Sequence, residues 1–471
     1  MAVLESIVSL LYSNALVILV IIPILHFGRN YFTPGARSVP GPFFAKLTNL
    51  WRFIDVAKGH PETTLYELHK KYGYYVRLGP NVISVRNLDV LKEIYGINKG
   101  YKKVLPSAPL PSLFLIYTHS GKQYDDFHAA IKRPVSGAYS MSTLTEFEPF
   151  VDSTIHTFFG KLDEFAQKKE RCDIAKWLQY YAFDVIGELT FGKALGFLET
   201  GHDVDGILES IEKNLDYAGK TGQMPWLDYL QVKNPVRQLL HGGSTTAVAQ
   251  FAKNRLQERL SQSGTKSNAR RDFLSRFFEA QVDHPKVVND RQVLSYTITN
   301  VNAGSDTTAI SLRAILYYTL KNPRVYAKLR EELDDSTSSG RISSPVTWKE
   351  SQELPYLDAV IKEALRLHPA VGLLLERIVP EGGLKLPDGP YLPPGTIVGV
   401  NPWIIHRSDI FGKDLDAFIP ERWLQGEKES NAEYAARKQK MIELENPDRE
   451  WETVNAWFVR QTNMDIKLSR R

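Results

Sequence analysis

An uncharged, apolar run of 21 residues extends from Ile7 to Phe27, close to the amino terminus. At about 1.5 Å per residue, a helix of this length just covers a hydrocarbon core of roughly 30 Å. A cleaved signal peptide would have a shorter apolar run with a basic segment before it, and a buried helix of a globular body is the other interpretation. We expect residues 1–28 to be a single-pass membrane anchor.

Charges flank this segment unequally. Glu5 precedes it, and the basic residues Arg29, Arg37, Lys46 and Arg52 follow it. Because cytosolic flanks carry the excess of Lys and Arg, we expect the rest of the chain to lie in the cytosol. Residues 29–52 are predicted to form a basic hinge, in which Pro40-Gly41-Pro42 makes a stiff, non-helical elbow. Residues 53–471 are predicted to form one domain.

Composition excludes several classes of protein. The formal net charge is +4 at pH 7, which is too balanced for a protein that coats nucleic acid, so no nucleic-acid partner is expected. Cys172 is the single cysteine among 471 residues. It excludes an internal disulfide and a multi-thiolate zinc or iron–sulfur site, although one thiolate ligand stays possible.

The pattern of apolar residues predicts a fold that is mainly α with a small β region. Residues 75–78 and 82–85 alternate around Gly79-Pro80-Asn81, which is typical of a hairpin. Helical periodicity marks residues 173–195 and 291–320. From Leu386 onward, Pro- and Gly-rich segments indicate short strands and turns.

The predicted helix over 291–320 contains an unusual polar segment, Ala303-Gly304-Ser305-Asp306-Thr307-Thr308. A glycine within a helix costs about 1 kcal/mol, and a buried aspartate costs more unless it is paired or solvated. Threonine hydroxyls can bond back to the i−4 carbonyl and bend a helix. An acid beside an alcohol at such a bend suits proton delivery. A tolerated glycine beside a solvated aspartate explains the segment equally well.

Two further motifs carry charge in apolar surroundings. Glu363 and Arg366 are spaced i, i+3, so they share one face of a helix that ends at His368-Pro369. Arg422 lies in the segment Phe418-Ile419-Pro420-Glu421-Arg422-Trp423. Taken alone, the first motif is explained by a surface ion pair worth about 0.2–0.5 kcal/mol, and the second has no specific meaning.

In this order, behind an anchor and a proline elbow, the three motifs resemble the cytochrome P450 family of haem-thiolate monooxygenases. The resemblance covers nearly the whole chain, and it is strongest to fungal members that modify small lipophilic metabolites. It implies that Asp306 and Thr307 relay protons, and that Ala303 and Gly304 open the helix for dioxygen. It also implies a buried structural triad of Glu363, Arg366 and Arg422, and an Arg377 that contacts a haem propionate.

The same resemblance implies the surroundings of the protein. It implies a haem cofactor, NADPH electrons delivered by a separate cytochrome P450 reductase, residence in the endoplasmic reticulum membrane and a lipophilic small-molecule substrate. Apolar residues in 106–117 and 457–459 are candidates for the lining of the substrate pocket.

The chain departs from the family in a helix near the amino terminus. The family offers a Trp and, four residues on, an Arg to the haem propionates; His128 and Lys132 are the nearest match here. A lysine ammonium is a point charge without the bidentate fork of arginine. His128 is equally well explained as an ordinary exposed helix residue.

A second departure affects the family's defining motif, Phe-x-x-Gly-x-Arg-x-Cys-x-Gly, whose thiolate is the axial iron ligand. The chain after Trp423 reads LQGEKESNAEYAARKQKMIELENPDREW and contains no cysteine. A deletion of a few tens of residues within 435–441 would leave the fold incomplete on the proximal haem side, with no metal ligand. Cys172 lies far upstream, and His368 or His406 would not supply the electron donation of a thiolate.

Two functional hypotheses therefore stay open. In the first, the lineage is a haem monooxygenase, and a segment of its gene is missing from this chain. In the second, the chain is an inactive pseudoenzyme or a non-catalytic, membrane-anchored binding protein.

Overall fold

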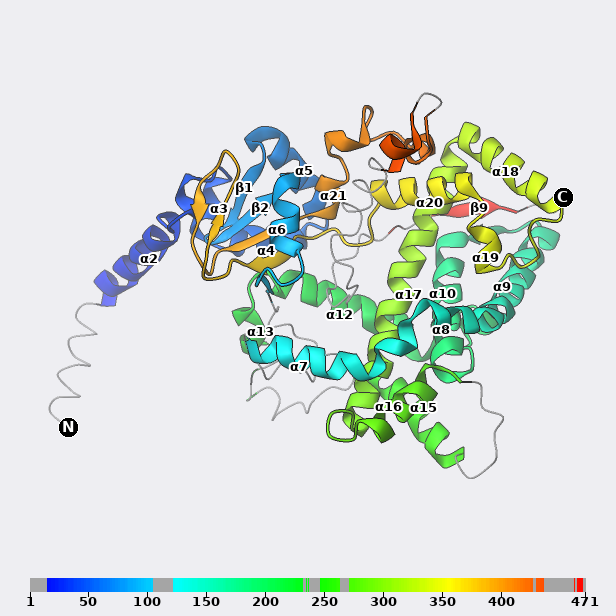
Figure 1. The fold of residues 1–471 in the computed structure, drawn as a ribbon. Coiled ribbons are helices and arrows are strands. Elements are labelled where there is room, and N and C mark those ends of the chain that lie inside the picture. The colour runs from blue at the N-terminus through cyan, green and yellow to red at the C-terminus, as the bar shows by residue number, and fades with distance from the viewer. Residues whose placement is uncertain are drawn as a thin grey trace.

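The structure is a computed structural model that describes residues 15–104, 122–231, 234, 236, 246–262, 271–426, 429–435, 461 and 464–468. A small sheet with short helices around it lies at one end of the molecule, and a larger group of helices forms the other end (Figure 1). The predicted class, mainly α with a small β region, is confirmed.

Helices account for most of the described residues. The α-helices are α2 (Ala15–Tyr31), α3 (Phe43–Leu47), α4 (Leu50–Ala57), α5 (Pro61–Tyr72), α6 (Leu91–Tyr95), α7 (Lys122–Lys132), α8 (Met141–Glu146), α9 (Glu148–Lys168), α10 (Ile174–Phe191), α11 (Phe197–Thr200), α12 (Ile207–Thr221), α13 (Trp226–Leu230), α15 (Ala247–Gln262), α16 (Phe273–Asp283), α17 (Asp290–Lys321), α18 (Pro323–Ser338), α19 (Trp348–Ser351), α20 (Pro355–Leu367) and α21 (Pro402–Ile405). The 3₁₀ helices are η1 (Ala36–Ser38), η2 (Leu88–Val90), η3 (Arg133–Tyr139), η4 (Val204–Gly206), η5 (Asp409–Phe411) and η6 (Pro420–Trp423).

Three sheets are described. The strands are β1 (Tyr75–Gly79), β2 (Val82–Val85), β3 (Lys102–Lys103), β4 (Arg171–Asp173), β5 (Leu375–Ile378), β6 (Leu384–Lys385), β7 (Tyr391–Leu392), β8 (Ile397–Val400) and β9 (Asp465–Lys467). The largest sheet has the order β1-β2-β8-β5-β3, and β4 pairs with β9 and β6 with β7. The predicted hairpin is confirmed, since Tyr75 pairs with Val85 in antiparallel register. The parallel pairing of β2 with β8 then joins an amino-terminal and a carboxy-terminal part of the chain in one sheet.

Local sequence explains where the two long central helices begin and end. The Asp173 carboxylate accepts a hydrogen bond from the Lys176 amide at the start of α10, and Gly192 ends that helix in the left-handed conformation. The Asn289 side chain caps α17 by accepting from the Gln292 amide at 3.0 Å. Both helices were predicted within a few residues of these ends.

The helical end and the sheet end have separate cores. The largest cluster of buried apolar side chains lies between α9, α10, α15, α16 and α17, where α10 packs along α17. A second cluster lies against the five-stranded sheet and extends to Trp423. The motif helices α17 and α20 pack against each other; α17 belongs to the helical core, and Ala359 of α20 belongs to the cluster against the sheet.

The predicted anchor is only partly described. Helix α2 begins at Ala15, whereas Ile7 to Asn14 lie outside the described residues. No helix within the described residues is both long and apolar enough to cross a bilayer. The candidate pocket residues 106–117 and 457–459, and most of the predicted junction at 435–441, also lie outside the described residues.

Candidate functional site

The acid–alcohol segment lies in the middle of α17, which is continuous from Asp290 to Lys321. The Thr307 hydroxyl donates to the carbonyl of Ala303 at 2.8 Å, and the Thr308 hydroxyl donates to that of Gly304 at the same distance. The opening that the resemblance implies at Ala303 and Gly304 is therefore not a break in the helix. A Cβ on Gly304 would lie 2.8 Å from Ile186 Cδ1, so this glycine permits the close approach of α10.

Asp306 is buried against α10. Asp306 is only 4% exposed, so its carboxylate is not solvated. Gln179 Nε2 donates to Asp306 Oδ1 at 2.8 Å, and Gln179 Oε1 accepts from Arg313 Nη2 at 2.8 Å. Gln179 thus links Asp306 to the buried guanidinium of Arg313, about two turns further along α17. The acid and the cation compensate each other's burial through one amide.

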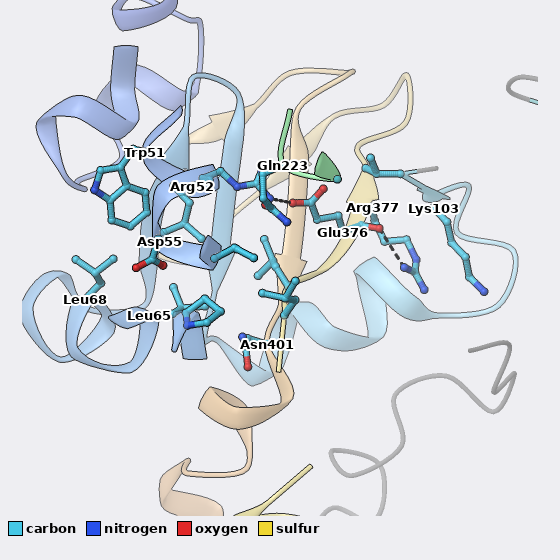
Figure 2. A pocket seen from close by; sticks show the side chains of 17 residues that line it. Trp51, Arg52, Asp55, Leu65, Leu68, Lys103, Gln223, Glu376, Arg377 and Asn401 are labelled. Carbon is cyan, nitrogen blue, oxygen red and sulfur yellow. Dashed lines mark hydrogen bonds and ion pairs between the residues drawn. The ribbon is translucent and has the colours of Figure 1, made fainter. Parts of the chain in front are cut away.

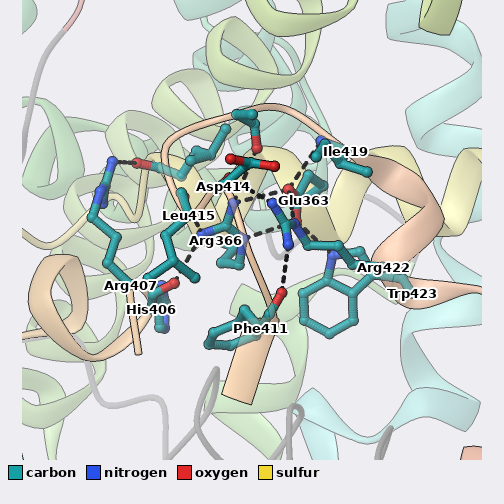
Figure 3. A network of polar contacts seen from close by, with 12 residues as sticks. Glu363, Arg366, His406, Arg407, Phe411, Asp414, Leu415, Ile419, Arg422 and Trp423 are labelled. Carbon is teal, nitrogen blue, oxygen red and sulfur yellow. Dashed lines mark hydrogen bonds and ion pairs between the residues drawn. The ribbon is translucent and has the colours of Figure 1, made fainter. Parts of the chain in front are cut away.

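Glu363, Arg366 and Arg422 meet in one buried network (Figure 3). Arg366 Nε and Nη2 donate to the two carboxylate oxygens of Glu363, each at 2.8 Å, and Arg422 Nε donates to Glu363 Oε1 at 3.2 Å. Glu363 and Arg366 are 0% exposed. A surface ion pair therefore does not describe this motif, and the geometry is that of a bidentate, charge-assisted pair.

Every donor position of Arg366 is used. Besides Glu363, its guanidinium donates to the carbonyl oxygens of His406 at 2.9 Å, Leu415 at 2.8 Å and Ala417 at 3.3 Å. Arg422 in turn donates to the carbonyls of Phe411 and Asp414. The network therefore fixes the segment between α21 and η6, which includes η5, against α20 by satisfying backbone carbonyls of that segment.

Two donors to Glu363 were missed by the sequence analysis. Trp423 Nε1 donates to Glu363 Oε2 at 2.9 Å, and the Ile419 amide donates to Glu363 Oε1 at 3.0 Å. In the segment that carries both donors, residues 418–423, the sequence predicts a role for Arg422 alone. The indole N–H of Trp423 was a usable signal, because a buried tryptophan needs an acceptor.

A neighbouring ion pair fastens the other side of η6. Glu421 binds Arg324 of α18 and accepts from the Tyr356 hydroxyl at 3.1 Å. Partial burial acts to raise the pKa of Glu421, but hydrogen bonds from Arg324 and Tyr356 outweigh it and lower the pKa to about 2. The carboxylate stays ionised at any ordinary pH, so this contact is independent of pH near neutrality.

The three predicted propionate contacts come from different parts of the fold. Arg377 lies on β5, is nearly buried, and places its guanidinium 4.9 Å from the ring centre of Tyr95. His128 and Lys132 lie half-buried on the last turns of α7, four residues apart and so on one face. Sheet and helix each present cationic or hydrogen-bonding groups, and their common role stays a prediction.

A pocket that is open to solvent lies beside the sheet (Figure 2). Residues of α4, α5, β3, β5 and the end of α12 line it. Arg52 of α4 forms an ion pair with Glu376 of β5 inside the pocket. Arg377 and Lys103 lie together on one side of the pocket (Figure 2). Burial raises the pKa of Asp55, the other acid in the lining. The pocket therefore combines apolar walls with charged side chains.

Cys172 does not belong to either feature. It lies on β4, pairs with Ile466 of β9 and is 0% exposed within the helical core cluster. His368 packs edge-on against Trp403 and His406 edge-on against Phe411, both within the packed interior. Among the described residues no three His, Cys, Asp or Glu side chains gather closely enough to hold a metal ion.

Comparison with known proteins identifies the family of the chain. The family model for cytochrome P450 matches residues 39–437. The chain belongs to the cytochrome P450 family.

The curated relatives agree with this assignment. The chain is 41% identical to a cytochrome P450 monooxygenase of Aspergillus terreus, over 91% of this chain and 89% of the relative. It is 38% identical to the cytochrome P450 monooxygenase cicH of Emericella nidulans, over 92% and 93% of the two chains, and 36% identical to pkfB of the same species, over 92% and 91%. All three relatives are named cytochrome P450 monooxygenases.

The family implies a haem, and the residues present fit it only in part. Helix α17, the buried triad and Arg377 are present, and their roles toward a haem stay predictions. The donor set lacks a thiolate for the iron, because the one cysteine is enclosed in a separate core. These residues do not fit a haem that is held through cysteine.

Proposed function

We propose that this chain has the scaffold of a monooxygenase that oxidises a small lipophilic secondary metabolite, but that the chain itself does not bind haem as a thiolate complex and does not oxygenate. One observation carries the proposal: the single cysteine, Cys172, lies on β4 within the helical core. A relative with the ligand segment would take electrons from NADPH through a separate reductase.

A missing segment is supported by the lengths of the alignments. Those with cicH and with a cytochrome P450 monooxygenase of Aspergillus candidus run over 475 and 499 positions, yet they cover only 92% and 96% of a 471-residue chain. These two alignments each therefore contain roughly 40 or more positions of the relative without a counterpart in this chain. The family match ends at residue 437, inside the interval 435–441 where the sequence suggests a deletion.

A membrane-anchored binding protein is the second candidate. The fully bonded Glu363 network and the open pocket beside the sheet support a chain that folds and keeps a cavity. The apolar amino-terminal run, with cations behind it, supports insertion in the endoplasmic reticulum membrane with a cytosolic body.

The haem content of the purified protein tests the proposal. With haem supplied during expression, we expect far less than one haem per folded chain, because a thiolate ligand is lacking. A full haem per chain that disappears in Cys172→Ser would contradict the proposal. Limited proteolysis of the same sample shows whether the chain is folded, and so separates loss of haem from loss of structure.

A further inference from the structure

Arg77 is a completely buried arginine on β1 whose guanidinium is surrounded by backbone carbonyls. Nη1 donates to Tyr31 O at 3.0 Å, and Nη2 donates to Asn30 O at 2.5 Å. Nη2 also donates to Pro80 O at 2.7 Å and Nε to Gly79 O at 3.2 Å, so the same side chain holds the turn between β1 and β2. None of the ion pairs found among the described residues involves Arg77.

Two of these acceptors are the last carbonyls of α2. The final carbonyls of a helix have no partner inside the helix, and they carry the negative end of its dipole. A guanidinium at that end satisfies the carbonyls and is favoured electrostatically. The charge of Arg77 is therefore compensated by the end of α2 rather than by a carboxylate.

The chain that follows α2 is fastened to the same strand. The Arg77 amide donates to Pro40 O at 2.7 Å, and a Cβ on Gly41 would lie 2.2 Å from Arg77 O. Asn30 Nδ2 donates to Leu47 O at 2.7 Å, which ties the last turn of α2 to the end of α3. The predicted proline elbow is thus packed against β1 and does not stand free of it.

The surface next to this clasp is apolar, aromatic and edged with cations. Side chains of α2 from Leu19 to Phe27 are exposed, as are Phe32, Phe43 and Phe44, the last two by 61% and 68%. Arg37 lies over the ring of Phe32 at 5.2 Å, and Lys46 lies 6.0 Å from that of Tyr31. Exposed aromatic rings beside Lys and Arg are typical of segments at a membrane–water interface.

We propose that the Arg77 clasp makes α2 and the surface of Phe32, Phe43 and Phe44 one rigid, lipid-facing unit, which fixes the angle between the anchor and the body. The inference rests on the proposed membrane anchoring. It goes beyond the predicted stiff elbow at Pro40-Gly41-Pro42, because the clasp fixes α2 itself to β1. In Figure 1, α2 extends away from the sheet end of the molecule.

The distance between two spin labels tests the clasp. Leu25→Cys on α2 and Thr63→Cys on α5 provide exposed label sites, and Cys172 is too buried to react. In vesicles of phosphatidylcholine and phosphatidylserine, we expect one narrow distance distribution for the otherwise unchanged protein. Arg77→Ala should broaden it about twofold or more, since the end of α2 loses its partner.

Two further variants keep the test decisive. Arg86→Ala is the matched control, because the Arg86 guanidinium also donates to a carbonyl, that of Arg407 at 3.1 Å, rather than to one of α2. Its distribution should stay narrow. If Arg77→Ala does not fold, Arg77→Lys retains the charge without a fork that reaches four carbonyls, and it should broaden the distribution as well.

The outcomes separate the clasp from the anchoring on which it rests. A broad distribution in the unchanged protein, or a narrow one in Arg77→Lys and Arg77→Ala, would overturn the clasp. Co-sedimentation with the vesicles reports anchoring independently. If the protein does not sediment with them, the anchoring proposal fails, and the lipid-facing role of the unit fails with it even if the distribution in detergent is narrow.

Discussion

At Glu363, one carboxylate accepts hydrogen bonds from α20, from the backbone at Ile419 and from two side chains of η6. Removing one partner from such a site leaves the other donors and cations buried without an acceptor. The resulting loss of folding free energy is much larger than the net stabilisation that the intact pair provides. An exposed pair such as Lys70 and Glu67 has water as an alternative partner at all times. The position of a charged pair therefore decides its importance.

Glu363→Ala is expected to destabilise the fold by about 3–5 kcal/mol, because it strands Arg366 and the Trp423 indole N–H in the interior. The urea midpoint and the rate of proteolysis measure the loss. Glu67→Ala is the control and should leave both nearly unchanged. Equal stability of the two variants would show that Glu363 is not a structural centre.

At the scale of elements, α10 and α17 touch closely because Gly304 lacks a side chain facing Ile186. A helical glycine normally costs stability, so its presence here is explained by the packing of two backbones. His69 joins α5 to the sheet by hydrogen bonds. Its Nδ1–H donates to Gly73 O at 2.8 Å, and its Nε2 accepts from the Ser84 hydroxyl of β2 at 2.7 Å.

Gly304→Val is expected to destabilise the protein by about 1–3 kcal/mol, since the new side chain overlaps Ile186. Gly160→Val on α9 is the matched control, because a Cβ at Gly160 meets nothing within 4 Å. Ile186→Ala in the same chain should recover part of the loss. Urea denaturation of the unchanged protein, of Gly304→Val, of Ile186→Ala and of the double variant measures the coupling, and equal midpoints for Gly304→Val and Gly160→Val would refute the close packing.

His69 is expected to make stability depend on pH. Burial lowers its pKa from 6.5 to about 4, so between these values the unfolded chain binds a proton that the folded chain does not. The contribution of His69 to the free energy of unfolding therefore keeps its full value above pH 6.5 and falls by roughly 3 kcal/mol as the pH decreases towards 4. Unfolding free energies of His69→Gln should fall less steeply over this range. The exposed His202→Gln should behave as the unchanged protein, and a steep fall in His69→Gln would contradict the assignment.

For the whole molecule, local patterns predicted the hairpin, α10, α17 and the end of α20 at Leu367. They could not predict the pairing of β2 with β8, because strands 315 or so residues apart in sequence leave no periodic signal. Gln179 was missed as the partner of Asp306 for the same reason. The triad was predicted through a family resemblance, and its full donor set required the fold.

Orientation in the membrane is the corresponding prediction for the whole chain. Protease added to sealed microsomes should digest the body, since Arg29 and Arg37 follow the apolar run and only Glu5 precedes it. Detergent should add no further cleavage of the body. Full protection until detergent is added would place the body on the lumenal side.

The carbon monoxide spectrum of the reduced protein tests the central claim most directly. A ferrous haem with an axial thiolate gives a characteristic red-shifted Soret band, because sulfur donates charge to the iron. For the 471-residue chain with reductase and NADPH, we expect no such band, and we expect it to appear when a ligand loop and its following helix are inserted between Arg437 and Met441. A thiolate-type band from the unmodified chain that is lost in Cys172→Ser would contradict the account.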